Sequence, residues 1–154
     1  MRKFKFTLQS VHNVRELREE KEQTVFARLS KDASEAEERL FEVSRKILSA
    51  MNSYTHSMRG GTALDPVVLD LHSKHIAALE RLKQRIIAEV EQKKSACREQ
   101  AKRLSNAARD VKVTAKLREK QKAVHDLEAA KSEQNTLDEI TSAKHARLAG
   151  ETNG

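Results

Sequence analysis

One stretch decides the fold, and it reads Arg59-Gly60-Gly61-Thr62-Ala63-Leu64-Asp65-Pro66. Its two glycines can adopt the left-handed backbone conformation that ends a helix. Asp65 suits the N-cap of a second helix, and Pro66 suits the first helical position. The stretch therefore predicts the end of one helix, a short turn over residues 59–65 and the start of another helix.

Downstream of this turn, the positions that would face a partner helix alternate steps of four and three residues. They are His72, Ile76, Leu79, Lys83, Ile86, Val90, Lys93, Cys97, Gln100, Leu104, Ala107 and Val111. This is the spacing of a coiled-coil seam. No proline follows Pro66, and the next glycine is Gly150, so the pattern predicts a helix over about 66–148. At 1.5 Å per residue it would reach roughly 120 Å.

Upstream of the turn, a second seam predicts a helix over about 8–58. Helical spacing of apolar residues starts at Leu8, Val11 and Val14, and residues 15–24 are mostly charged. The seam then continues through Val25, Leu29, Ala33, Ala36, Leu40, Val43, Ile47, Met51, Tyr54 and Met58.

A short polar connection between two long amphipathic helices indicates an antiparallel hairpin. The predicted fold class is all-α, a long antiparallel two-helix coiled coil, and we expect one elongated hairpin over residues 1–154. Folding near residue 62 brings the start of the first helix beside residues 110–120. About 25 to 30 residues at the end of the chain would then extend past the hairpin.

The composition fits this prediction, with 34% charged residues, 3% aromatic residues and no tryptophan. Sustained heptads argue against disorder. No apolar run approaches roughly 18 residues, so we expect no transmembrane segment, and the basic N-terminus lacks the apolar core of a secretory signal. The single cysteine, Cys97, lies on the seam, where we expect a small buried hydrophobe in a reducing cytoplasmic setting.

The surplus of basic residues behind the net charge of +7 is concentrated near the open end of the predicted hairpin. Arg2, Lys3 and Lys5 supply one part of it. The other part, opposed only by Glu119, is Lys112, Lys116, Arg118, Lys120 and Lys122. This basic open end is either a solvated face or a binding surface for an acidic protein or a nucleic-acid backbone. Because the chain has no nucleic-acid recognition motif, we expect no nucleic-acid partner.

A second apolar stripe begins the long helix and consists of Leu71, His75, Ala78 and Leu82. It either broadens the packing at the tip of the hairpin or forms a docking face for another protein.

The sequence predicts no enzyme, no metal site and no cofactor. The six histidines are scattered, and nothing completes a metal site around His72 and His75. There is no glycine-rich phosphate-binding loop, and a two-helix hairpin has no concave pocket in which to build catalytic residues.

Both ends of the chain resemble the flagellar export protein FliJ family. Phe4-x-Phe6-x-Leu8-x-x-Val11, followed by Arg15 and Glu19, resembles the opening of that family. Glu133-Gln134-x-x-Leu137-Asp138-Glu139-Ile140 resembles its closing signature. The chain differs from the family pattern at His12, where an apolar residue is frequent, and at Ser132, where a basic one is common.

This resemblance implies an antiparallel coiled coil similar to the central stalk of rotary ATPases. Such proteins insert their terminal ends into the ring of the hexameric export ATPase (FliI type), touch the export gate (FlhA type) and help to handle export chaperones. The ATPase carries out hydrolysis, and the stalk would be cytoplasmic and peripheral to the inner membrane at the flagellar export apparatus.

On this hypothesis the residues in contact with the ring are Phe4, Phe6, Leu8, Val11, Arg15, Glu133, Gln134, Leu137, Asp138, Glu139 and Ile140. The stripe from Leu71 to Leu82 would dock the gate or a chaperone. Two alternatives stay open, namely the equivalent stalk of a virulence injectisome (YscO type) and a generic structural or nucleic-acid-binding coiled coil.

Overall fold

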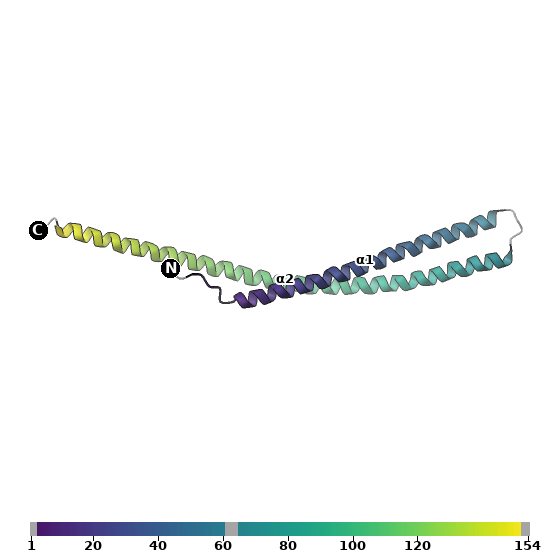
Figure 1. Cartoon of the computed structure of the whole chain (residues 1–154), viewed down its shortest axis with the longest axis horizontal. Helices are drawn as coiled ribbons and strands as arrows, with labels where there is room; N and C mark the ends of the chain where they lie inside the picture. Colours follow the sequence, from purple (N-terminus) through teal and green to yellow (C-terminus); the bar gives the residue numbers. More distant parts are fainter. Residues whose placement is uncertain (1–2, 61–64, 152–154) are drawn as a thin grey trace. The chain divides into compact units, whose positions relative to one another are not determined.

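The computed structural model describes residues 3–60 and 65–151, and within these residues the chain is all-α (Figure 1). Helix α1 spans Gln9–Arg59 (51 residues) and α2 spans Pro66–Glu151 (86 residues). The two helices pack together in opposite directions. The predicted all-α hairpin coiled coil is thereby confirmed.

The start of α2 is capped as the sequence predicts. The backbone N–H of Val67 donates to Asp65 Oδ1 at 2.9 Å. The N–H groups of Val68 and Leu69 donate to the Asp65 carbonyl at 3.1 and 3.2 Å. Asp65 therefore satisfies three donors that a helix start leaves without partners. The predicted turn includes residues 61–64, which lie outside the described residues.

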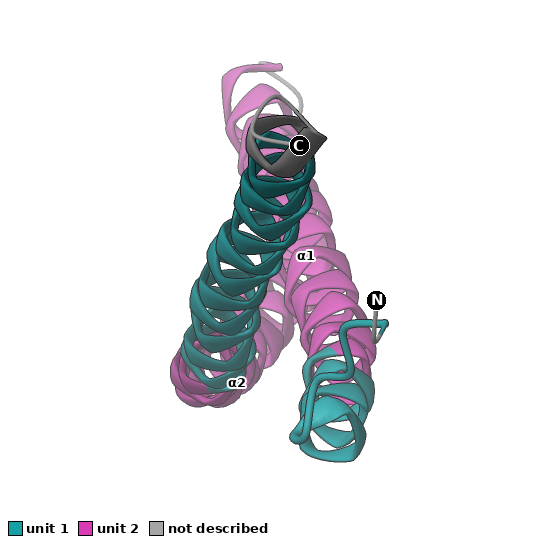
Figure 2. Cartoon of the chain, turned by 90° about the vertical axis from the view of Figure 1, so that its left-hand side faces the viewer, with its two compact units in different colours: residues 1–19, 107–154 teal, residues 20–106 magenta. Residues whose placement is uncertain are grey.

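The chain divides into two compact units, and both helices contribute to each (Figure 2). One unit consists of residues 1–19 and 107–154, which we call the terminal unit. The other consists of residues 20–106, which we call the central unit.

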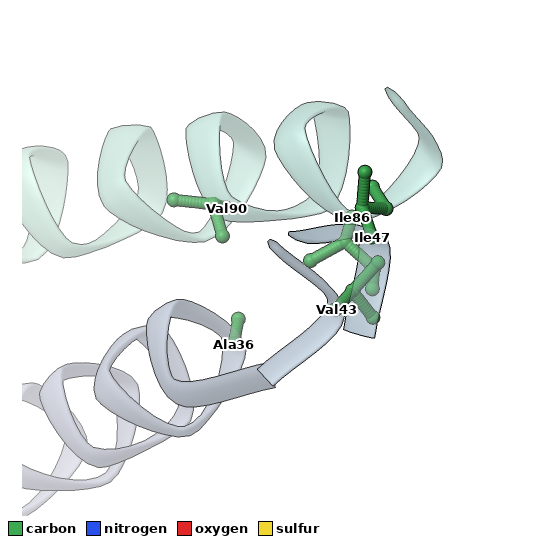
Figure 3. Packing of buried hydrophobic residues seen from close by; sticks show 5 residues of the cluster. All are labelled: Ala36, Val43, Ile47, Ile86 and Val90. Carbon is green, nitrogen blue, oxygen red and sulfur yellow. The ribbon is translucent and has the colours of Figure 1, made fainter. Parts of the chain in front are cut away.

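The core of the central unit is a cluster of aliphatic side chains from both helices. Val43 and Ile47 of α1 lie against Ile86 of α2, and Ala36 lies opposite Val90 (Figure 3). Leu40 and Leu79 pack against this cluster and are partly buried. A helix this rich in charge is stabilised in water mainly by burying such a face.

Ion pairs flank this core. Arg39 of α1 and Lys93 of α2 both contact Glu89 Oε1, at 2.7 and 2.9 Å, and Lys94 pairs with Glu37. The Lys93 ammonium, and after it the Arg39 guanidinium, hold the pKa of Glu89 below its usual value. The stabilisation from the two pairs of Glu89 is present at neutral pH and is lost as acid protonates its carboxylate.

The seam of α2 is confirmed at every position predicted between His72 and Val111, since each is buried or half-buried. The seam of α1 is confirmed from Val25 to Ile47. The predicted positions Met51 and Met58 are wrong, because both side chains are exposed. Ala50 is buried and Ser57 is half-buried instead. The alternating steps that pass through Val43 and Ile47 reach residues 50, 54 and 57, so geometry places Ala50 and Ser57 on the seam in place of the two methionines.

At the start of α1 the seam is polar. Val11 and Val14 are exposed, whereas His12 is buried and Arg15, Glu19 and Glu22 are half-buried. Alternating steps of three and four residues upstream from Leu29 lead to these positions. The spacing set by the apolar residues further along α1 therefore continues into a segment that has no apolar side chains to match it.

Replacing Ile86 by alanine should lower the free energy of unfolding by about 2–4 kcal/mol, because it opens a cavity in the aliphatic cluster. The neighbouring Ile87 is 39% exposed, so Ile87→Ala should cost at most about 1 kcal/mol. Urea unfolding followed by circular dichroism measures both. Equal losses would contradict the described packing.

Candidate partner-binding surfaces

The N-terminal residues predicted to contact a ring divide into two groups in the structure. Phe6 is buried, and the ring of Phe4 meets His125 of α2 edge to face, with centroids 5.6 Å apart. Arg15 Nη1 donates to the Asp110 carbonyl at 2.9 Å. These side chains hold the terminal unit together. Leu8 and Val11, at 38% and 41% exposed, are available to a partner.

The C-terminal residues predicted to contact a ring are all exposed. They are Glu133, Gln134, Leu137, Asp138, Glu139 and Ile140. Among them, Glu133, Leu137 and Ile140 follow the i, i+4, i+7 spacing of one helix face. This part of α2 therefore presents an apolar pair beside a carboxylate.

His12, where the chain departs from the family pattern, is buried at the polar seam and has a polar partner. His12 Nδ1 lies 2.7 Å from Thr114 Oγ1, and its Nε2 lies 3.3 Å from Glu16 Oε1. The Thr114 hydroxyl also lies 2.9 Å from the Val111 carbonyl, and the tautomer of the imidazole decides whether His12 Nδ1 donates to Thr114 or accepts from it. The imidazole thus replaces an apolar contact with a hydrogen bond between the two helices.

A second polar contact crosses the seam in the central unit. Gln100 is buried, and its Nε2 donates to the Glu22 carbonyl at 3.1 Å and also to the Glu22 carboxylate. Polar groups buried at these positions have partners, as buried polar groups require.

The five residues of the basic open end, Lys112 to Lys122, are exposed. Within residues 3–60 and 65–151, none of the five lies within ion-pair distance of a carboxylate. Lysines of the central unit differ, because Lys74 pairs with Asp70 and Lys102 with Glu99. Among the described residues, these five basic side chains therefore have no carboxylate partner.

The stripe formed by Leu71, His75, Ala78 and Leu82 is exposed along its whole length, with Leu71 at 67% and Leu82 at 40%. His75 also lines a groove of about 370 Å³ together with His72 and Leu79, and this groove reaches across to α1. The stripe is therefore open to solvent, with His75 at the edge of the groove between the helices.

Sequence reasoning missed another exposed apolar stripe, formed by Val113, Leu117, Val124 and Leu127 of α2. Its residues lie one to three residues along the sequence from the buried or half-buried positions of α2, such as Thr114 and His125. The signal was present in the sequence, because steps of four and three residues from Val113 pass through all four residues.

The remaining candidates from the sequence are the single cysteine, a metal site and a membrane span. Cys97 is half-buried and lines a groove with Phe26 and Ala33. The described residues contain no group of three side chains able to hold a metal ion. Over the same residues, neither helix has a segment apolar enough to cross a bilayer.

A family model described as the flagellar FliJ protein matches residues 4–150. The chain belongs to the FliJ family. The match extends over both terminal motifs and confirms the resemblance inferred from them. No curated protein and no solved structure matches the chain. FliJ family membership makes the chain a stalk component of the flagellar export apparatus, and the family is one of non-catalytic structural components.

Breaking the hydrogen bond between His12 and Thr114 from one side should destabilise the hairpin. We expect Thr114→Val to cost about 1–3 kcal/mol, because it leaves the buried imidazole without its partner. Urea unfolding of this variant, of His12→Leu and of the double variant gives the coupling energy. We expect the double variant to recover most of the loss, since two apolar groups then replace the polar pair.

The matched control is Thr136→Val, which alters an exposed threonine whose hydroxyl bonds only the Ser132 carbonyl of its own helix. Its stability should change by less than about 0.5 kcal/mol. Strictly additive losses for His12→Leu and Thr114→Val would show that the two side chains do not interact.

Proposed function

We propose that the chain is the central stalk of the flagellar export machinery and that it couples a hexameric export ATPase of the FliI type to an export gate of the FlhA type. Its terminal unit enters the ATPase ring, and the ATPase carries out hydrolysis. The chain also helps to handle export chaperones. It works on the cytoplasmic side of the inner membrane, where the export apparatus holds it.

The exposure of Glu133 to Ile140 is the observation that carries this proposal. Nothing among the described residues covers Leu137, at 63% exposed, or Ile140, at 49%. Apolar side chains that lie on one helix face beside a carboxylate provide an anchor and a charged rim for a protein partner. Leu8 and Val11 add apolar surface at the start of α1.

Phe4, Phe6 and Arg15 serve the ring contact indirectly in this proposal. Their contacts fix the start of the chain against α2 and so position Leu8 and Val11. Removal of the first residues would therefore disturb the fold and the binding surface together, which makes the C-terminal segment the better place for a test.

The gate or a chaperone docks on the stripe from Leu71 to Leu82. Support comes from its exposure and from the adjoining groove lined by His72 and Leu79. An apolar stripe rimmed by polar residues is typical of a protein-binding surface. It lies in the central unit, so the two proposed contacts use different units of the chain.

Binding to the export ATPase should weaken about tenfold or more in the variant Leu137→Asp with Ile140→Asp, because two charges replace the apolar anchor. Both side chains are exposed, so circular dichroism should report unchanged helicity. A pull-down or interferometry with the purified ATPase measures the affinity, and Leu48→Asp, at an equally exposed leucine of the central unit, is the matched control. If the double variant binds the ATPase as tightly as the parent chain, the proposed ring contact is wrong. Binding of the chain to DNA that weakens as salt is added would favour the nucleic-acid alternative.

Leu71→Asp with Leu82→Asp should abolish binding to the gate or the chaperones and leave the helicity of the chain unchanged. The half-buried Leu79 supplies the contrasting control, because Leu79→Asp inserts a charge into the seam and should lower the helicity. Circular dichroism and binding to the purified gate domain and chaperones measure both effects. If the exposed pair lowers helicity as much as Leu79→Asp, the stripe belongs to the core.

A further inference from the structure

The apolar stripe of Val113, Leu117, Val124 and Leu127 on α2 has the spacing of a coiled-coil seam. Steps of four, three, four and three residues connect these residues through Lys120. Their exposed fractions are 61%, 36%, 58% and 70%. Four large apolar side chains in heptad spacing on a solvent-exposed helix face form a surface that a further helix can cover.

This stripe is separate from the face of α2 that packs against α1. In the terminal unit that face consists of Ala107, Val111 and Thr114, which are buried or half-buried, and α1 meets it through His12 and Arg15. The stripe lies on a neighbouring face of the helix and takes no part in those contacts.

The charges on and beside the stripe are mainly basic. Lys120 occupies a position within it, a further step of four residues from Leu127 reaches Lys131, and Lys116 lies one turn from Lys120. The acidic residues beside it are Asp110, one step of three residues before Val113, and Asp126 and Glu128 next to Leu127. No ion pair engages these lysines in the part of the chain that the structure describes. A partner helix that supplies carboxylates would remove the repulsion between the lysines and cover the apolar residues.

We infer that this stripe binds an acidic amphipathic α-helix of a partner protein. Heptad spacing selects a helix as the occupant, and the unpaired lysines select its charge. A second copy in parallel would place Lys120 against Lys120. A bilayer surface requires an uninterrupted apolar face, and a nucleic acid leaves four apolar side chains unused.

The stripe lies in the terminal unit that we propose enters the ring, but its four residues are not among those proposed to contact the ring or the gate, so the inference goes beyond the proposed function. It is also tested without the ATPase, so its failure and the failure of the proposed function are distinguishable.

The probe is a fluorescein-labelled synthetic helix of about three heptads with leucine at positions a and d and glutamate at e and g. Its own glutamates repel one another and oppose self-association. Fluorescence anisotropy with the full chain should show saturable binding that weakens as salt is added. A sequence with lysine in place of every glutamate should not bind.

Leu117→Asp with Val124→Asp should raise the dissociation constant for the probe by about tenfold or more. Lys116→Glu with Lys120→Glu should do the same, and these exposed lysines can be changed without disturbing any packing. The matched control is Phe41→Asp with Leu48→Asp, which removes apolar side chains that are 66% and 61% exposed in the central unit. This control should bind the probe as the parent chain does.

Three results would overturn the inference. In the first, the Lys116 and Lys120 variant binds the probe as tightly as the parent chain. In the second, sedimentation shows a dimer of the parent chain that Leu117→Asp with Val124→Asp converts to a monomer, which makes a second copy the occupant. In the third, anionic lipid vesicles bind the chain through these residues while the acidic helix does not.

Discussion

The packing of Val43 and Ile47 of α1 against Ile86 of α2 is the interaction on which the rest of the fold depends. About one residue in three carries a charge, so neither helix has another way to bury apolar surface. Once these aliphatic side chains meet, the alternating steps of four and three residues assign every other residue to a face. The same spacing decides which polar groups become buried at the start of α1 and which apolar groups remain in water.

The two units have different seams. The central unit buries aliphatic side chains and surrounds them with ion pairs, as between Arg39 and Glu89. In the terminal unit α1 contributes His12 and Arg15 to the seam, and hydrogen bonds link them to Thr114 and to the Asp110 carbonyl of α2. A segment with few buried apolar contacts opens at a lower free energy than a packed core. The part of the chain with the terminal family motifs is therefore held together by more specific and individually weaker contacts.

Much of this arrangement could be predicted from the sequence, because the seam of α2 combines regular spacing with apolar residues such as Ile76, Ile86 and Val90. The prediction failed where spacing and hydrophobicity disagree. Met51 is more apolar than Ala50, and Val11 is more apolar than His12, yet in each pair the less apolar residue is the buried one. The terminal motifs identified the family but did not separate the buried Phe6 from the exposed Leu8. That difference arises because an extended segment packs back on α2, which helical periodicity does not describe.

The buried pair of His12 and Thr114 has a consequence for the alignment of the two helices. Repetitive, charge-rich helices can slide along each other by seven residues with little change in their outer faces. Such a slip would place His12 opposite Ala107 or Gln121 and would separate its ring nitrogen from the Thr114 hydroxyl. The pair therefore favours the observed alignment over the shifted ones. In the observed alignment the aromatic ring of Phe4 also meets His125, so the hydrogen bond and the ring contact together hold the start of the chain at one position along α2.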